Sequence, residues 1–215
     1  MNRYFILAAT ALLAVAGCKD KHNPVKAAKQ AGQERDLQNT FQSECQLKPV
    51  DLVITGLFTG GKAVVKSART LYRFEGNRVT RTTQFFAATN CSAEAGAFIE
   101  TGVFEINKDI KTNDGGKGID LKFDKVALKI ASPEGAQIAN SIKMCDRSDW
   151  SAGQEKVVTP QSENTSCYGA KVPRTDANVY RVDNGNLILG SSLKTDRDAS
   201  SRPSKLDFGT KYAGK

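Results

Sequence analysis

The sequence is poor in the side chains on which much enzyme chemistry depends. It has one histidine, one tryptophan and two methionines, and the histidine is His22, near the N-terminus. A Ser-His or Cys-His arrangement in a folded domain would therefore have no histidine to use. The cysteines form no C-x-x-C pair, the chain has no H-x-x-x-H, and "NDGG" (113–116) predicts a turn rather than a calcium loop. We expect a non-catalytic protein without a metal or a cofactor.

A hydrophobic run long enough to span a bilayer comfortably is also missing. The apolar run from Tyr4 to Ala16 is clearly shorter than the roughly 20 residues that a membrane-spanning helix needs. It follows the basic Arg3 and precedes small residues, which is the layout of a secretory signal. "VAGC", ending at Cys18, resembles the bacterial lipobox. The resemblance implies a signal peptide over residues 1–17 and acylation of Cys18 with palmitate-type chains; a plain signal peptide is the alternative.

Lipidation of Cys18 would determine where the protein lies. Two or more acyl chains hold a protein firmly on a membrane, whereas one chain does so only marginally. In the lipoproteins that this start resembles, an aspartate after the cysteine favours the inner membrane, so Lys19 implies the outer membrane of the cell envelope. Residues 18–40 are polar and predict a flexible tether. Residues 41–215 are left for a single folded domain.

The excess of positive charge does not by itself identify a partner. The chain has 31 Lys and Arg against 23 Asp and Glu, which gives a formal net charge of +8. These charges are scattered and interleaved, and the basic runs with stacking aromatics that nucleic-acid modules use are not evident. We expect no nucleic-acid partner.

Four cysteines remain beyond Cys18, namely Cys45, Cys91, Cys145 and Cys167. An even number in an exported protein predicts structural disulfides, and three connectivities satisfy the count.

The stretch "RTLYRFEGNRVTRTTQFF" (69–86) predicts a β-hairpin, because Gly76-Asn77 suits a two-residue turn. That turn pairs Glu75 with Arg78 and Phe74 with Val79, a salt bridge and an apolar contact, which favours this register. One face of the hairpin then carries a mainly apolar set of residues, with Arg81 as its exception: Tyr72, Phe74, Val79, Arg81 and Phe85.

Further short alternating segments predict more strands. They are 50–58, 101–109, 119–131 and the region around "NVYRVDNGNLILGSS". Within 119–131 the alternation slips between Phe123 and Val126, which predicts either a bulge or a tight turn at Asp124-Lys125. Ser132 predicts an N-cap for one short helix ending near Cys145, and 146–175 predicts loops, in which Trp150 is a packed anchor or a sugar-stacking platform.

Seven to nine short strands with one helix predict an all-β fold, either an antiparallel barrel or a sandwich. In a strand-by-strand meander the end of the first strand, near Cys45, lies at the same rim as Cys91. We therefore expect Cys45–Cys91, with Cys145–Cys167 closing the late loop.

Several segments together resemble small secreted bacterial lipocalin-like (calycin) domains. They are "NTFQSECQ", "LYRFEGNRVTRTTQFFAATNC", "ETGVFEI" and "YRVDNGNLILG". The resemblance implies an antiparallel up-and-down barrel of about eight strands, often with an internal ligand cavity.

Two functional hypotheses follow. The first is a lipid-anchored barrel that binds a small hydrophobic or amphipathic ligand, anionic ligands included, in a cavity lined by Tyr72, Phe74, Arg81 and Phe85. The alternative is a packed barrel that binds or inhibits another envelope protein through its loops. The surroundings of Arg81 distinguish the two hypotheses, because a buried guanidinium needs a partner. The candidate partners are Glu105, a ligand or water. If Arg81 lies at the rim instead, the hairpin has a structural role only.

Overall fold

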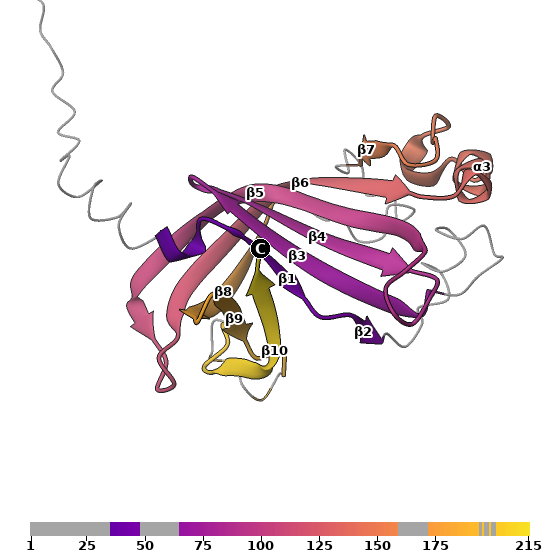
Figure 1. The fold of residues 1–215 in the computed structure, drawn as a ribbon. Helices are drawn as coiled ribbons and strands as arrows, with labels where there is room; N and C mark the ends of the chain where they lie inside the picture. Colours follow the sequence, from indigo (N-terminus) through magenta and orange to yellow (C-terminus); the bar gives the residue numbers. More distant parts are fainter. Residues whose placement is uncertain (1–34, 48–64, 159–171, 194, 196–197, 199–200) are drawn as a thin grey trace, which may run out of the picture. The chain divides into compact units, whose positions relative to one another are not determined.

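Eight antiparallel strands close into a barrel in the computed structural model of the chain (Figure 1). The structure describes residues 35–47, 65–158, 172–193, 195, 198 and 201–215. β1 pairs with both β3 and β10, and this double pairing closes the barrel. The predicted all-β barrel with one short helix is confirmed. The strands are β1 (Thr40–Ser43), β3 (Ser67–Glu75), β4 (Arg78–Phe86), β5 (Glu94–Lys111), β6 (Lys117–Ile130), β8 (Arg174–Asp183), β9 (Asn186–Gly190) and β10 (Leu206–Gly214).

Smaller elements extend the barrel at its ends. They are the 3-10 turns η1 (Arg35–Leu37) and η2 (Met144–Asp146), the helix α3 (Pro133–Ser141), and the short strands β2 (Gln46–Leu47) and β7 (Glu155–Val157). β7 lies inside the segment predicted to be loops. It pairs with β6 at 127–129, beyond the point where β8 stops pairing with β6. β7 therefore covers the edge of β6 that β8 leaves unpaired.

The β3–β4 hairpin has the register that its sequence predicts. Glu75 lies opposite Arg78, and Phe74 lies opposite Val79. Gly76 has a φ of +61°, a backbone conformation that glycine adopts at little cost. The turn residue thus fixes which side chains of both strands face the barrel interior.

The predicted phase slip in β6 is a bulge. Lys125 pairs with Thr101 and Phe123 pairs with Gly102, so Asp124 is left without a partner on β5. β6 therefore continues as one strand, and Phe123 and Val126 both contribute to the buried core. Gly102 permits this close approach, because a Cβ there would overlap the Lys122 carbonyl oxygen and lie 2.8 Å from Phe123 Cα.

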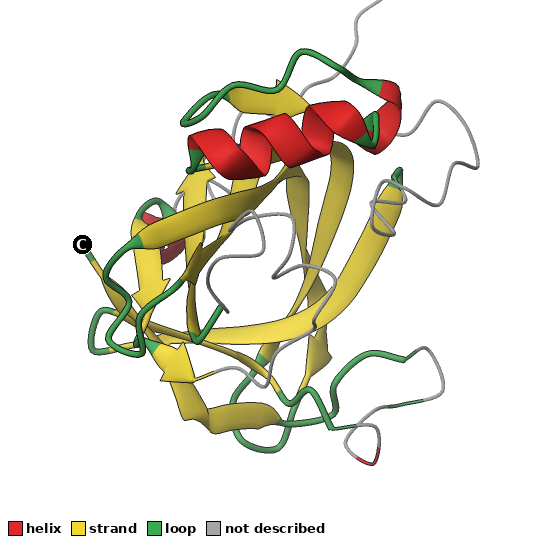
Figure 2. Cartoon of the chain, turned by 90° about the vertical axis from the view of Figure 1, so that its right-hand side faces the viewer, coloured by secondary structure: helices red, strands yellow, loops and turns green. Residues whose placement is uncertain are grey.

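The predicted helix lies across one end of the barrel (Figure 2). Its N-cap is Ser132, whose side chain accepts a hydrogen bond of 2.9 Å from the Gly135 N–H. Trp150 is buried, and its indole N–H donates to the Met144 carbonyl at 3.2 Å. Trp150 is thus a packed loop anchor, and its interpretation as a sugar-stacking platform is wrong.

Three clusters of buried apolar side chains occur among the described residues, and two of them are large. We call the first the aromatic cluster; it contains Phe41, Tyr72, Phe74, Phe104 and neighbouring aliphatic residues from β6, β8 and β9. We call the second the helix-end cluster; it joins α3 and Trp150 to the second half of β6, with Val126, Leu128 and Ile130. Leu37 is fully buried in the aromatic cluster, so packing begins before residue 41, inside the segment predicted to be a tether.

One predicted disulfide is present, and several predictions concern residues that the structure does not describe. Cys45 and Cys91 are bonded, with their Cα atoms 5.7 Å apart. Cys145 is disulfide-bonded, but its predicted partner Cys167 lies outside the described residues. So do Cys18, the signal peptide, most of the tether and the predicted strand at 50–58. Within the described part of the chain, no helix has the length and apolar character to cross a membrane.

Gly102→Ala should destabilise the barrel strongly, because the new methyl group would collide with the β6 backbone, which cannot move aside as a side chain can. We expect a loss of at least about 3 kcal/mol in the free energy of unfolding, measured by chemical denaturation. Gly76→Ala is the control, because no atom lies within 4 Å of a Cβ there; its positive φ should cost about 1–2 kcal/mol. Equal losses for the two variants would contradict the tight crossing at Gly102.

Candidate functional site

Arg81 lies inside the barrel wall and contacts two protein carboxylates. Its Nε donates to Glu100 Oε2 at 2.5 Å, and its Nη1 donates to Asp176 Oδ2 at 2.7 Å. Glu100 is only 2% exposed. A buried carboxylate of this kind needs a charged, hydrogen-bonded partner, because desolvation of an unpaired charge costs several kcal/mol.

A second arginine completes the arrangement. Arg174 donates to Asp176 Oδ1 at 2.8 Å through Nη1 and to Glu100 Oε1 through Nη2. The guanidinium carbons of Arg81 and Arg174 lie 4.7 and 5.4 Å from the centre of the Phe123 ring. We call Arg81, Glu100, Arg174 and Asp176 the ion network; within it each cation contacts each carboxylate and the formal charges cancel.

Strand pairing brings the ion network together. Arg81 lies opposite Tyr72 on β3 and opposite Glu100 on β5. Further along the same sheet, Arg174 of β8 lies opposite Phe123 of β6, and Asp176 lies two residues further along β8. Arg81 and Asp176 are 95 residues apart in the sequence, so their contact depends on the strand order β4-β5-β6-β8 and on the curvature of the sheet.

The ion network determines the protonation of the buried groups around it. Burial by itself would lower the pKa of Arg81, but the hydrogen bond to Glu100 and the charges of Glu100 and Asp176 outweigh burial and raise the pKa. Burial raises the pKa of Tyr72, and the neighbouring Arg81 opposes this only in part. Arg81 is therefore a fixed cation and Tyr72 a neutral phenol across the ordinary pH range.

Glu105 is not the partner of Arg81, so that prediction is wrong. Glu105 forms a salt bridge of 2.7 Å with Lys122, and both side chains are largely exposed. Glu105 is an odd number of positions from Glu100 along β5, and side chains alternate between the two faces of a strand. The sequence did not predict the true partners of Arg81, because Glu100 lies just before the predicted strand at 101–109 and Asp176 directly follows the predicted loops at 146–175.

The four residues predicted to line a cavity are divided between different surroundings. The Tyr72 ring stacks on the Phe74 ring with centres 6.2 Å apart, and Phe74 meets the Phe104 ring edge-on at 5.1 Å. Phe85 instead packs against the helix-end cluster. The ion network thus lies beside the aromatic cluster, in which Tyr72 and Phe74 pack on each other, whereas Phe85 belongs to the other cluster.

The turn at 113–116 has a structural role. Asp114 Oδ2 accepts a hydrogen bond of 2.7 Å from the Leu206 N–H, and Oδ1 accepts one from the Thr112 hydroxyl. Burial acts to raise the pKa of Asp114, but these hydrogen bonds outweigh it and lower the pKa. Among the residues that the structure describes, no cluster of three His, Cys, Asp or Glu side chains is arranged to hold a metal ion.

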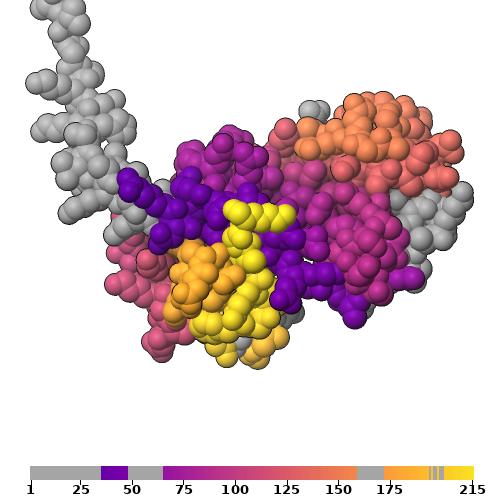
Figure 3. Space-filling model, in the orientation of Figure 1, coloured from indigo at the N-terminus to yellow at the C-terminus, as the bar shows by residue number. Residues whose placement is uncertain are grey.

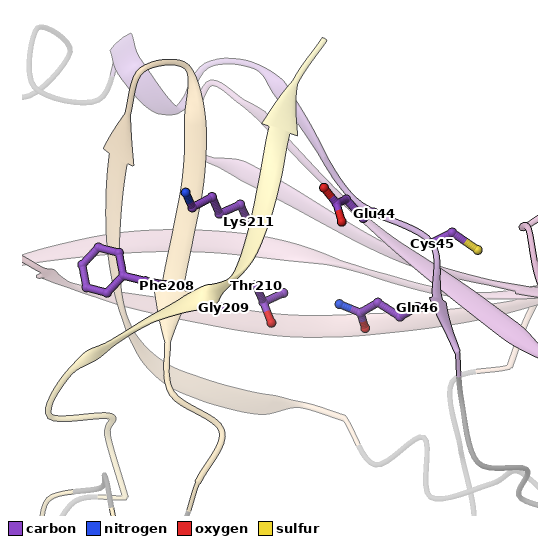
Figure 4. Close-up of a pocket in the computed structure, with 7 residues that line it drawn as sticks. All are labelled: Glu44, Cys45, Gln46, Phe208, Gly209, Thr210 and Lys211. Atoms are coloured by element: carbon purple, nitrogen blue, oxygen red, sulfur yellow. The ribbon is translucent and has the colours of Figure 1, made fainter.

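The outer surface has a cleft where the first and last strands separate. β1 pairs with β10 from Phe41 to Ser43, after which the chain follows β3 instead. In Figure 3 these two ends of the chain, indigo and yellow, lie next to each other on one face. The cleft has a volume of about 220 Å³. Its walls, drawn in Figure 4, are Glu44, Cys45, Gln46, Phe208, Gly209, Thr210 and Lys211.

No protein-family profile matches this chain, and no curated protein sequence matches it. The closed eight-stranded antiparallel barrel with its short helix is compatible with a calycin-like fold.

Arg81→Met should destabilise the protein by about 3–5 kcal/mol, because it leaves the buried Glu100 with one cation fewer. Arg73→Met is the matched control: its salt bridge to Glu75 is largely exposed, and its loss should cost at most about 1 kcal/mol. Both losses in the free energy of unfolding are to be measured by chemical denaturation.

A double variant extends the same measurement. Arg81→Met combined with Glu100→Leu removes a cation and an anion together, so its destabilisation should fall below the sum of the two single losses. Additive losses, or an Arg81→Met cost no larger than that of Arg73→Met, would contradict the assigned ion network.

Proposed function

We propose that this chain is a lipid-anchored barrel of the bacterial cell envelope that acts as a non-catalytic interaction module and binds another envelope protein through its surface. The observation that carries this proposal is the ion network. At the position where an amphipathic ligand would place an anionic group, Arg81 already binds Glu100 and Asp176.

The ligand-binding alternative is disfavoured by the cost of making room. An anionic headgroup that bound Arg81 would have to displace a carboxylate from the guanidinium. The displaced Glu100, which is 2% exposed, would then remain buried with weaker pairing, at a cost of several kcal/mol. An acyl chain would in addition have to separate the rings of Tyr72 and Phe74, which are in contact with their neighbours.

The same contacts suit a rigid scaffold. Paired charges link β4, β5 and β8 inside the barrel, and such contacts between strands hold them in one register. A scaffold of this kind presents its loops and strand edges in fixed positions, which lowers the entropy cost of binding a protein partner.

The membrane part of the proposal rests on the sequence. "VAGC" at 15–18 has the lipobox pattern, and Lys19 favours the outer membrane over the inner one. The polar residues after Cys18 would separate the barrel from the lipid. A barrel placed in this way meets other envelope proteins at high local concentration, so that even weak surface contacts become effective.

Native mass spectrometry of the full-length chain purified from its own host tests the interaction function. We expect the mass of the lipidated chain without a small ligand, together with species that contain a second polypeptide. A stoichiometric hydrophobic or amphipathic molecule that remains bound after purification, and whose affinity falls in Arg81→Met, would overturn the proposal in favour of ligand binding.

Cys18→Ala should release the protein from membranes, because the acyl chains have no other predicted attachment point. The measurement is the fraction of the chain in the membrane pellet after cell fractionation. Cys45→Ala, which removes a cysteine of the barrel disulfide, should leave membrane attachment unchanged. Retention of the Cys18→Ala protein in the pellet after a high-salt wash would refute lipid anchoring.

A further inference from the structure

We propose that the cleft between β2 and β10 binds an extended segment of a partner polypeptide, which adds a strand to the free edge of β2 and places a basic side chain against Glu44. This inference rests on the proposed interaction function and names the surface that performs it. Three observations support it: strand edges that no described strand pairs with, a fixed opening, and a charged side chain that forms no ion pair with a described residue.

Both walls of the cleft expose strand edges. β2 pairs with β3 through Gln46 and Leu47, and among the described strands nothing pairs with its other edge. In β10, the register with β9 runs from Leu206 directly to Lys211, and pairing with β1 ends at Tyr212. The backbone from Asp207 to Thr210 therefore has no partner strand among the described residues. An added strand pairs with such an edge through alternate N–H and C=O groups.

Covalent and hydrogen-bonded contacts hold the cleft open. The Cys45–Cys91 disulfide fastens the chain between β1 and β2 to the segment after β4. The Ser43 hydroxyl accepts a hydrogen bond from the Thr70 N–H at 3.0 Å, which holds the same region on β3. On the opposite wall, Asp207 Oδ1 accepts from the Gly209 N–H at 2.9 Å and shapes the irregular part of β10. These contacts keep the two walls apart before binding, so a binding segment need not separate them.

The side chains around the cleft indicate what kind of segment fits. Glu44 and Gln46 point toward β10, and Thr210 lies on the facing strand (Figure 4). Glu44 is exposed and forms no ion pair with any described residue. A lysine or arginine on the incoming segment would supply the missing cation.

Apolar side chains stand at the margins of the same region. Leu47 is 70% exposed at the end of β2, and Phe208 is 48% exposed on β10. Peptides that bind by strand addition obtain their affinity from main-chain hydrogen bonds and their specificity from alternate side chains. The expected segment is therefore extended and combines a basic residue with apolar neighbours.

Peptide selection on the full-length chain tests this proposal. The probe is a library of random short peptides displayed on phage, and each selected peptide is then synthesised and its dissociation constant measured by calorimetry. We expect selected peptides to contain Lys or Arg, and methylation of alternate backbone nitrogens to abolish binding, because it removes the N–H groups that pair with β2. Glu44→Lys should weaken binding by roughly tenfold or more.

Matched variants separate this site from general charge effects. Glu155→Lys, an exposed charge reversal on β7, should leave the dissociation constant unchanged. Thr210→Pro should also weaken binding, because it removes an N–H from the opposite wall. The proposal is overturned if no peptide is selected, if N-methylation has no effect, or if both charge reversals act equally. A partner protein that binds Glu44→Lys normally would refute the cleft and leave the interaction function standing, whereas a stoichiometric internal ligand would refute the interaction function.

Discussion

The ion pairs that Arg81 forms with Glu100 and Asp176 are the contacts on which the rest of this barrel depends. They join β4 and β5, which pair with each other, to β8, which is distant in the sequence, and they lie on the ring of Phe123 beside the packed aromatic side chains. A buried ion pair contributes little net stability relative to an apolar pair of the same size, but it penalises heavily any arrangement in which one partner is lost. The network therefore acts mainly by excluding other registers and other strand pairings.

That exclusion has a consequence for function. A barrel that binds ligands internally needs space and unsatisfied polar groups in its interior, whereas here the central guanidinium groups are each bound to two carboxylates. The recognition chemistry that remains is at the surface, where strands end or separate. This arrangement supports the proposal that the protein acts through the outside of its barrel, while the interior side chains fix the positions of the strands.

Local signals in the sequence predicted local structure well. Gly76-Asn77 fixed the hairpin register, and Ser132 marked the start of the helix, because turn geometry and capping depend on a few adjacent residues. The partners of Arg81 could not be found in this way. Asp176 lies 95 residues from Arg81 and reaches it because β4, β5, β6 and β8 follow one another in a curved sheet. Contacts of this kind depend on the order and curvature of the strands and not on residues that are adjacent in the sequence.

The Cys45–Cys91 disulfide connects stability with the proposed binding surface. A bridge that closes a segment of 46 residues restricts the unfolded chain and stabilises the fold by about 2–4 kcal/mol. A bridge elsewhere on β3 or β4 would stabilise to a similar degree. This one lies where the chain leaves β10, so it also prevents β2 from returning to β10 and closing the seam. Its position is explained if the open seam itself is the feature that the fold maintains.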